Sequence, residues 1–452
     1  MTRSSSDDAR ARAVEHLLRH AFSAHPASAA GERLGVEAEV IPVHADTRRV
    51  CTIESGEPRS SLAMVRAVAE RYGWTERRSA KGVPSFAIPG GGVLTFEPGG
   101  QIEIASPALH SGSRVLDWLD RALGALGEEA DEQGIELLTA GIDPYNGIDH
   151  VPRQLDAPRY ARMEAHFARI GPAGARMMRQ TAAVQVNVDA GDTVWERWHV
   201  LNAAVPYLTA IFANSPCYAG ASTGHRSFRA HTWRHTDPRR TGIPFDARDA
   251  AGGYADFALG APVISAMLPA EFASVREFPT ARELAERDEL PDALWVDHLS
   301  TLFPEVRPRG FLEVRSIDAL PPQWYAAVVA MVGALARAPR ARRAALAILP
   351  DPSLEMLCRA GRVALGDPDI ASTAAALADV ALAGCAELGA SFLEPRHVEI
   401  AREFVARYTA RRRSPADDVS AAPFVPVAAS RPERRDRDAG ERDPRAPVVP
   451  PS

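Results

Sequence analysis

Four short segments of this chain alternate hydrophobic and polar side chains with a period of two, starting near Gly35, Phe96, Val184 and Phe311. Successive side chains on a β-strand point to opposite faces, so each segment predicts a strand with one apolar and one polar face. The apolar faces carry Val36, Ala38, Val40, Ile102, Ile104, Leu312 and Val314. The polar faces carry Glu37, Glu39, Gln101, Glu103, Gln185, Asn187, Glu313 and Arg315.

Carboxylates crowd the polar face of this predicted sheet. Two carboxylates at positions i and i+2 lie about 6.7 Å apart and repel by about 2.5 kcal/mol at an effective dielectric near 20. A solvated outer face of an antiparallel sheet would tolerate this repulsion. A site for divalent cations would remove it, and carboxylates without thiolates suit Mg²⁺ or Mn²⁺. Glu97 joins this set less directly, because Pro98-Gly99-Gly100 interrupts the strand between Glu97 and Glu103.

The remaining pattern predicts helices between and after the strands. Apolar positions spaced three and four residues apart favour helices over residues 8–22, 60–72, 111–133, 157–170, 193–213, 281–290 and 292–303, and repeatedly from about 323 to 412. Further strands are expected over residues 85–88, 93–96, 135–140 and 257–268, with a long loop over residues 214–233. Alternating rather than continuous apolar strands favour an α+β fold, an antiparallel sheet with helices on its apolar face.

The domain boundaries follow from composition. We expect a flexible start over residues 1–8, one catalytic domain over residues 9–412, and a disordered Pro-, Arg- and Asp-rich tail over residues 413–452. The net charge of −6 gives no indication of a nucleic-acid or membrane partner. The start of the chain has no signal-peptide pattern and no segment approaches about 18 uninterrupted apolar residues, so a cytoplasmic location is expected.

Arginine supplies almost all the positive charge, and no Gly-Lys-Ser/Thr sequence is present, which excludes a P-loop. Three arginines are candidates for holding phosphate or carboxylate groups, because the planar guanidinium matches both. Arg315 shares the acidic face with Glu313, whereas Arg226 and Arg229 lie in the long predicted loop. The alternative role for Arg315 is an ion pair with a neighbouring glutamate, and the alternative for Arg226 and Arg229 is plain solvation in the loop.

Five motifs occur in an order that resembles the plant- and actinobacterial-type glutamate–cysteine ligases, in particular their ergothioneine-pathway branch. The resemblance covers roughly residues 30–410. The motifs are Gly35 to Glu39, Phe96 to Glu103, Gln185 to Asn187, Arg226 to Trp233, and Glu313 to Arg315. It implies a glutamine-synthetase-like catalytic fold, in which a concave sheet face carries the metal ions and helices cover the other face.

The resemblance also implies a reaction. ATP would phosphorylate the γ-carboxylate of L-glutamate, and the amine of L-cysteine would attack the acyl phosphate to give γ-glutamylcysteine. The magnesium or manganese ligands implied by the motifs are Glu37, Glu39, Glu97, Glu103 and Glu313. The residues implied to contact the transferring phosphoryl group, the substrates or the nucleotide are Arg315, Arg229, Gln101, Gln185, Asn187, Arg226, His231 and Arg179. His231 could instead be a metal ligand, and for His231 and Arg179 structural roles remain open.

Two other functions are compatible with the sequence. A ligase of the same architecture could join glutamate to a different amine, since no residue is assigned to the acceptor pocket. A protein of the same fold could bind metal and nucleotide without catalysis, although retention of all five glutamates argues against this. The sequence alone does not decide the acceptor amine, the downstream thiol or the oligomeric state.

Overall fold

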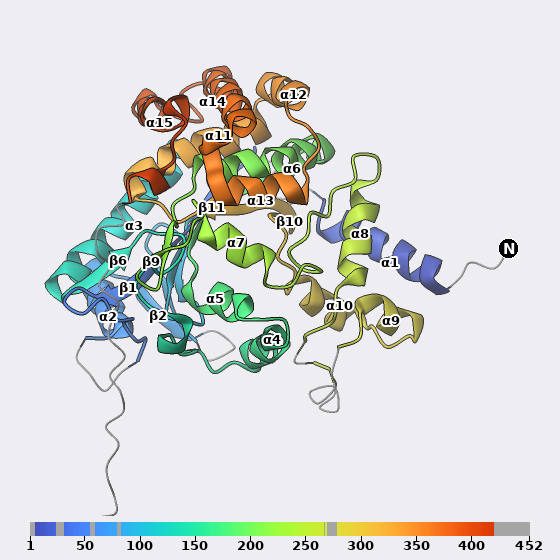
Figure 1. Cartoon of the computed structure of the whole chain (residues 1–452), viewed down its shortest axis with the longest axis horizontal. Helices are drawn as coiled ribbons and strands as arrows, with labels where there is room; N and C mark the ends of the chain where they lie inside the picture. The colour runs from blue at the N-terminus through green and yellow to red at the C-terminus, as the bar shows by residue number, and fades with distance from the viewer. Residues whose placement is uncertain are drawn as a thin grey trace, which may run out of the picture.

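The computed structural model describes residues 5–23, 31–54, 59–78, 83–265, 267–268 and 278–419. Its centre is a mixed-length antiparallel sheet with the strand order β10-β11-β7-β1-β5-β4-β3-β2, and β6 pairs with the far end of β1. Helices α11 to α15 lie together on one side of the molecule, and α1, α8, α9 and α10 form a separate group at another side (Figure 1). The α+β class and the antiparallel pairing predicted from the alternation are confirmed.

The strands within the described residues are β1 Leu34–His44, β2 Thr75–Arg78, β3 Pro84–Ala87, β4 Val93–Phe96, β5 Ile102–Ala105, β6 Ile135–Leu138, β7 Ala183–Asp189, β8 Cys217–Tyr218, β9 Ala221–Ser222, β10 Val306–Pro308 and β11 Phe311–Asp318. The helices are α1 Ser5–His20, α2 Ser61–Tyr72, α3 Gly112–Glu132, α4 Pro158–Ala168, α5 Ala173–Gln180, α6 Val194–Ile211, α7 Phe228–Arg234, α8 Ala250–Gly260, α9 Ala281–Glu286, α10 Asp292–Leu299, α11 Tyr325–Arg337, α12 Pro339–Ile348, α13 Leu354–Val363, α14 Pro368–Leu388 and α15 Pro395–Arg407.

The two faces of the sheet separate as the alternation predicts. The inward apolar side chains of β1, β5, β7 and β11 are buried in the main core, namely Val36, Ala38, Val40, Ile102, Ile104, Val184, Val186, Val188, Leu312 and Val314. Helices α3, α6 and α11 contact these strands and cover their apolar face. Burying this surface stabilises the fold by roughly 25 cal/mol per Å² of apolar area removed from water. The acidic face is therefore not covered by these three helices, and it can contact other helices and bind ligands.

Two predicted elements differ from the structure. The described residues of 257–268 form no strand: residues 257–260 belong to α8, which the Asp249 side chain caps by accepting from the Gly252 amide, and residues 261–265 and 267–268 lie in no helix or strand. The expected loop over residues 214–233 contains the short pair β8–β9 and the helix α7. The Ser227 side chain caps α7, but arginines and histidines occur around the helix and hide its apolar period.

The two ends of the described chain are more ordered than expected. Helix α1 begins at Ser5, inside the predicted flexible start. At the other end Ser414 and Asp417 form a reciprocal cap around a turn of 3-10 helix, and the backbone of Ala416 donates to Ala213. The ordered part thus continues past residue 413. The rest of the predicted disordered tail, residues 420–452, lies outside the described residues.

The segment around Pro98 is a hairpin and not one continuous strand. Strand β4 ends at Phe96, a tight turn follows, and β5 returns antiparallel to β4. Gly100 takes a φ of 93°, which favours glycine, and the Glu97 amide donates to the Gln101 carbonyl at 2.8 Å. This turn brings Glu97 back beside Glu103, so the interruption noted in the sequence helps to collect the acids.

Helix α14 has the length and composition of a membrane-spanning helix, with 44% of its most apolar window buried in this structure. It packs against α11, α12 and α15. An apolar core helix of a helical bundle has the same composition, so α14 fits the run of helices predicted after residue 323.

A glycine contact in the Glu97 turn generates a prediction. A β-carbon added at Gly99 would lie 1.9 Å from the backbone oxygen of Arg179, and backbone atoms cannot move aside cheaply. We expect Gly99→Ala to destabilise the protein by about 2 kcal/mol or more. The measurement is the urea midpoint of unfolding.

The matched control is Gly124→Ala in α3, where a β-carbon would meet nothing within 4 Å. That change should be neutral or stabilise the protein by about 0.5–1 kcal/mol through helix propensity. Equal midpoints for the two variants would contradict the close packing of the turn against α5.

Candidate active site

The acidic face of the sheet forms the floor of a cavity of about 320 Å³. Its floor comes from β1, β5, β7 and β11 and from the β4–β5 turn. Its walls come from α4, α5, α7 and the segment after α10, with Arg159, Tyr160, Met178, Trp233 and Phe303. The cavity collects all five glutamates singled out from the sequence, together with Gln101, Gln185 and Arg315.

Strand register determines which polar side chains meet. Glu37 of β1 lies opposite Gln185 of β7, and Glu39 lies opposite Glu103 of β5. The Gln185 amide donates to Glu39 at 3.0 Å, and the Asn187 amide donates to Glu37 at 2.7 Å. The amides of β7 therefore hold the carboxylates of β1 in place. From the sequence, these amides are expected only to contact substrate or nucleotide.

Glu313 lies in a different electrostatic setting from the other acids. Arg307 donates to both of its oxygens at 2.5 and 3.1 Å, and Arg315 donates at 2.9 Å. Burial alone would raise the pKa of Glu313, but the two guanidinium groups outweigh burial and lower this pKa to about 2. Glu313 is thus engaged as a counter-ion of two arginines, and metal ligation by it would require a change of partners.

The other four acids have raised pKa values. Burial raises the pKa of Glu39 and of Glu97 to about 7, against the attraction of Arg315. Burial and then repulsion by neighbouring glutamates raise the pKa values of Glu37 and Glu103. The crowding of carboxylates inferred from the sequence is therefore present in the folded protein.

The residues of the cavity fit a hard divalent cation. Among the described residues no group of three acid, histidine or cysteine side chains is arranged to hold a metal ion alone. Mg²⁺ usually takes one or two carboxylates and completes its shell with water and substrate phosphates. The buried Asn187 Oδ1 has no hydrogen-bond partner, so an unpaired oxygen lies beside Glu37. Pairs of carboxylates and this oxygen suit Mg²⁺ held jointly with a phosphate ligand.

Several predicted site residues lie elsewhere or serve the scaffold. Arg226 pairs with Asp417 at 2.9 Å, His231 lies in a groove behind α7, and Arg179 faces Glu164 at 3.5 Å. Buried Arg229 donates to the Arg315 carbonyl at 2.7 Å and approaches Asp318 at 3.8 Å, behind the cavity wall. Gln101 reaches the cavity, but its amide is bonded to Thr181 and Gly99.

The sequence reasoning missed the residues that complete the walls. Arg307 and Arg309 flank the β10–β11 turn, and Arg309 lies 3.9 Å from Glu313. The Trp233 ring lies beneath the guanidinium groups of both Arg229 and Arg315, at 5.0 and 5.7 Å. Arg307 lies opposite Glu313 because β10 pairs with β11. A strand of only three residues is too short for its alternation to predict this pairing from the sequence.

Acids with raised pKa values face a cluster of arginines in this cavity, a combination of charges that metal-dependent phosphoryl transfer uses. The chain belongs to glutamate–cysteine ligase family 2, whose family model matches residues 33–396. The resemblance stated from the motifs is thereby confirmed.

Two relatives illustrate this membership. Glutamate–cysteine ligase EgtA of Mycolicibacterium smegmatis is 34% identical over 352 residues, spanning 74% of this chain and 78% of that protein. The chloroplastic glutamate–cysteine ligase A of Oryza sativa subsp. indica is 31% identical over 300 residues, spanning 64% of this chain and 60% of the plant protein.

The fold also matches a solved structure. The glutamate–cysteine ligase from Francisella tularensis in complex with AMP aligns with a TM-score of 0.51 at 10% identity, covering 86% of this chain and 84% of that one. At this identity the likeness shows the fold alone.

The raised pKa values generate a prediction about stability. Between the ordinary carboxyl pKa of 4.5 and about 7, Glu39 and Glu97 hold more protons in the folded protein than in the unfolded chain. Stability therefore falls as pH rises through this window when divalent ions are chelated. We expect Tm to fall by a few degrees between pH 5 and pH 8 from this cause.

Added Mg²⁺ at pH 8 should recover the lost stability, because it replaces the protons as the counter-charge. The matched control is Glu39→Gln, which should reduce the pH dependence and the recovery by Mg²⁺. A Tm that rises with pH in chelator, in both proteins, would contradict the raised pKa values.

Proposed function

We propose that this protein joins L-glutamate to L-cysteine in an ATP-dependent, ADP-forming reaction. The γ-carboxylate oxygen attacks the terminal phosphorus of ATP, ADP leaves, and the cysteine amine then displaces phosphate from the acyl phosphate. The observation that carries the proposal is the cavity in which four acids of raised pKa face Arg307 and Arg315. The ergothioneine pathway implied by the motifs is part of the proposal.

A divalent cation, Mg²⁺ or Mn²⁺, supplies neutralisation of phosphate charge when it is bound. Glu37, Glu39, Glu97 and Glu103 would hold it from the sheet, with the Asn187 oxygen at hand. Arg315 and Arg307 would take up charge on the transferring phosphoryl group, since their guanidinium groups already point at a carboxylate that a phosphate can replace. The amides of β7 keep the acids oriented throughout.

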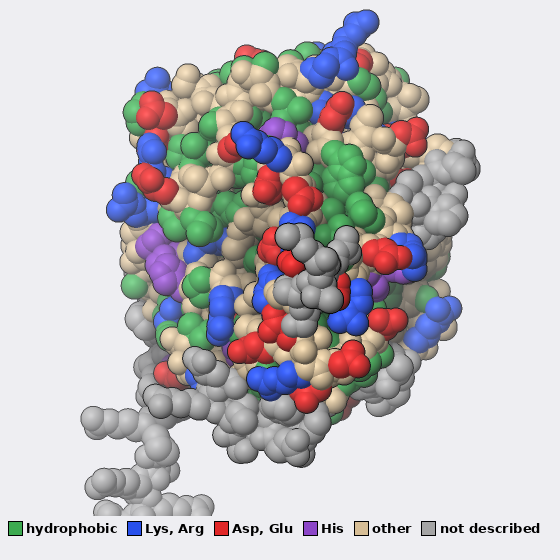
Figure 2. Space-filling model, turned by 90° about the vertical axis from the view of Figure 1, so that its right-hand side faces the viewer, with side chains coloured by type: hydrophobic (Ala, Val, Ile, Leu, Met, Phe, Trp, Pro, Cys, Tyr) green, Lys and Arg blue, Asp and Glu red, His purple; other side chains and the backbone are tan. Residues whose placement is uncertain are grey.

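The molecular surface agrees with small-molecule substrates. Figure 2 shows acidic and basic side chains interspersed over the face that carries the described parts of α1 and α8 to α10. A strand of nucleic acid would favour a continuous basic stripe instead.

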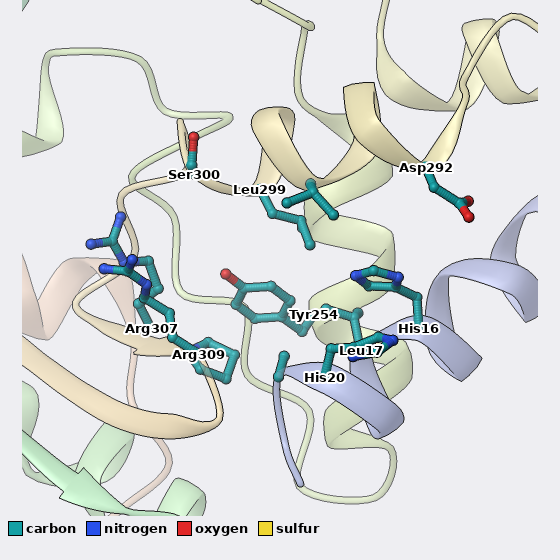
Figure 3. Close-up of a pocket in the computed structure, with 12 residues that line it drawn as sticks. His16, Leu17, His20, Tyr254, Asp292, Leu299, Ser300, Arg307 and Arg309 are labelled. Atoms are coloured by element: carbon teal, nitrogen blue, oxygen red, sulfur yellow. The ribbon is translucent and has the colours of Figure 1, made fainter. Parts of the chain in front are cut away.

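A second cavity, of about 560 Å³, adjoins the acidic cavity and shares Ser300, Arg307 and Arg309 with it. In Figure 3, Tyr254 lies at its centre, the two arginines lie at one end, and His16 lies at the opposite side. Leu17, Val296 and Leu299 add apolar walls. A cavity of this size suits a drug-sized ligand rather than cysteine, so we assign it to the nucleoside of ATP, with the phosphates directed past the arginines.

The proposed reaction is tested with the purified chain, ATP, Mg²⁺, glutamate and a panel of amines, with products identified by mass spectrometry. We expect ADP and γ-glutamylcysteine with cysteine. Product with another amine and none with cysteine would show that the protein is a ligase for a different acceptor amine. No turnover with any amine would favour a protein of this fold that binds metal and nucleotide without catalysis.

Removal of one metal-facing charge should abolish this turnover. Glu103→Gln keeps the side-chain size but removes an acid from the cavity, and we expect kcat to fall at least about a hundredfold. The matched control is Glu136→Gln in β6, outside the cavity, which should behave as the unaltered protein. Near-normal turnover of Glu103→Gln would remove this residue from the metal site.

Filling the second cavity should weaken nucleotide binding selectively. Val296 is half exposed at the cavity wall, so Val296→Trp can be accommodated by the fold. We expect the KM for ATP to rise about tenfold or more while the KM for glutamate stays constant. Ile348→Trp, an exposed position at the end of α12, is the control. A change confined to the glutamate or cysteine KM would assign the cavity to that substrate.

A further inference from the structure

Helix α7 separates two hollows of the molecule. Trp233 on one side of the helix faces the acidic cavity, and His231 and His235 face a groove of about 450 Å³ on the other side. The opposite wall of this groove is α13, which contributes Glu355, Cys358 and Arg362. The reaction proposed above uses none of these groove residues.

The two helices pack closely. The amides of Arg226 and Ser227, just before α7, donate to the carbonyl of Gly361, near the end of α13. A β-carbon at Gly361 would lie 3.1 Å from the Ala230 side chain. Cys358 precedes Gly361 by nearly one turn of α13, and both residues line the groove together with His235. Within the described residues Cys358 is the exposed cysteine.

Three imidazoles form a row along this groove. The ring centroids of His225 and His231 are 4.3 Å apart, and those of His231 and His235 are 4.1 Å apart. His231 lies in α7 and His235, four residues on, is the C-cap of this helix; two histidines at this spacing can bind one metal ion.

Backbone contacts orient the outer two rings. The Nδ1 of His235 contacts the His231 carbonyl at 2.8 Å, and the Nδ1 of His225 contacts the Thr223 carbonyl at 3.2 Å. A carbonyl only accepts, so each Nδ1 carries the proton and each Nε2 presents a lone pair. The His225 contact is of the kind that typically orients a metal-binding histidine, whereas the His235 contact is given up when its side chain rotates to bind.

The charge balance of the groove permits a cation. Arg234 is paired with Glu305, and Arg359 is paired with Asp367. Glu355 and a Cys358 thiolate would add negative charge.

We propose that His225, His231, His235 and Cys358 bind a transition-metal ion of the Zn²⁺ class in the groove between α7 and α13. Imidazole and thiolate ligands suit such an ion and do not suit Mg²⁺. The ligand atoms do not converge in advance, since no ready-made group of three is present among the described residues. Binding requires rotation of the side chains of His235 and Cys358, which are both exposed. The thiol proton is released to solvent as the sulfur–metal bond forms.

Such an ion would join α7 to α13 on the side opposite the reaction. The other side of α7 carries Arg229, which holds the carbonyl of Arg315, and Trp233, which lies under both arginines. A bound ion would therefore fix the helix that supports the arginine wall. This consequence is independent of which amine the enzyme joins.

Cobalt(II) is the probe, because its spectrum reports tetrahedral geometry and thiolate ligation. The full chain is stripped with a chelator, saturated with Mg²⁺ and titrated with Co²⁺. We expect visible d–d bands and a near-ultraviolet sulfur-to-cobalt band, both removed by Zn²⁺. Cys358→Ser should lose the near-ultraviolet band, and His235→Ala should weaken Co²⁺ binding at least about tenfold.

Two further variants complete the test. His150→Ala, an exposed histidine outside the groove, should bind Co²⁺ as the unaltered chain does. Glu103→Gln should lose ligase turnover yet keep the cobalt spectrum, which separates this site from the proposed function. Absence of the tetrahedral bands in the unaltered chain, or their persistence in Cys358→Ser with an unchanged sulfur band, would overturn the proposal.

Discussion

The structure depends on one electrostatic arrangement: four acids brought together in a cavity where burial raises their pKa values, beside arginines that cannot lose their charge. Hydrogen bonds from Gln185 and Asn187 hold the acids of β1 at fixed positions, and Arg307 and Arg315 balance Glu313. Antiparallel register makes the arrangement possible, because it places Glu39 opposite Glu103 although they are far apart in sequence. The helices packed on the apolar face stabilise the sheet against the repulsion between the carboxylates on its other face.

Much of this floor could be predicted from the chain alone. Alternation of period two sorts Val36 from Glu37 and Leu312 from Glu313, because side-chain direction on a strand is a local property. The walls could not be predicted in the same way. Arg307 and Trp233 reach the cavity only through the pairing of β10 with β11 and the packing of α7, which are long-range features. Arg226 and His231 belong to one of the five motifs that resemble the family. Arg226 nevertheless pairs with Asp417, and the ring of His231 stacks on Phe228.

Helix α7 explains why motif reasoning and geometry differ. The motif from Arg226 to Trp233 contains residues of two environments, because neighbouring residues of a helix point in different directions. Asp318 accepts from Ser215 and Ser227 at 2.7 and 2.9 Å and so fixes where α7 begins. Part of the motif thus preserves the position of the helix, and another part forms the cavity wall.

The acidic cavity carries both acids and arginines, and this combination of charges affects whether metal ion and nucleotide bind separately or as a complex. A free nucleotide meets four acids that repel its phosphates, and a free metal ion meets arginines that repel it. A metal–phosphate complex carries both signs at once and can satisfy both walls. Under the proposed function, the metal ion and the nucleotide would bind with positive coupling, each raising the affinity of the cavity for the other.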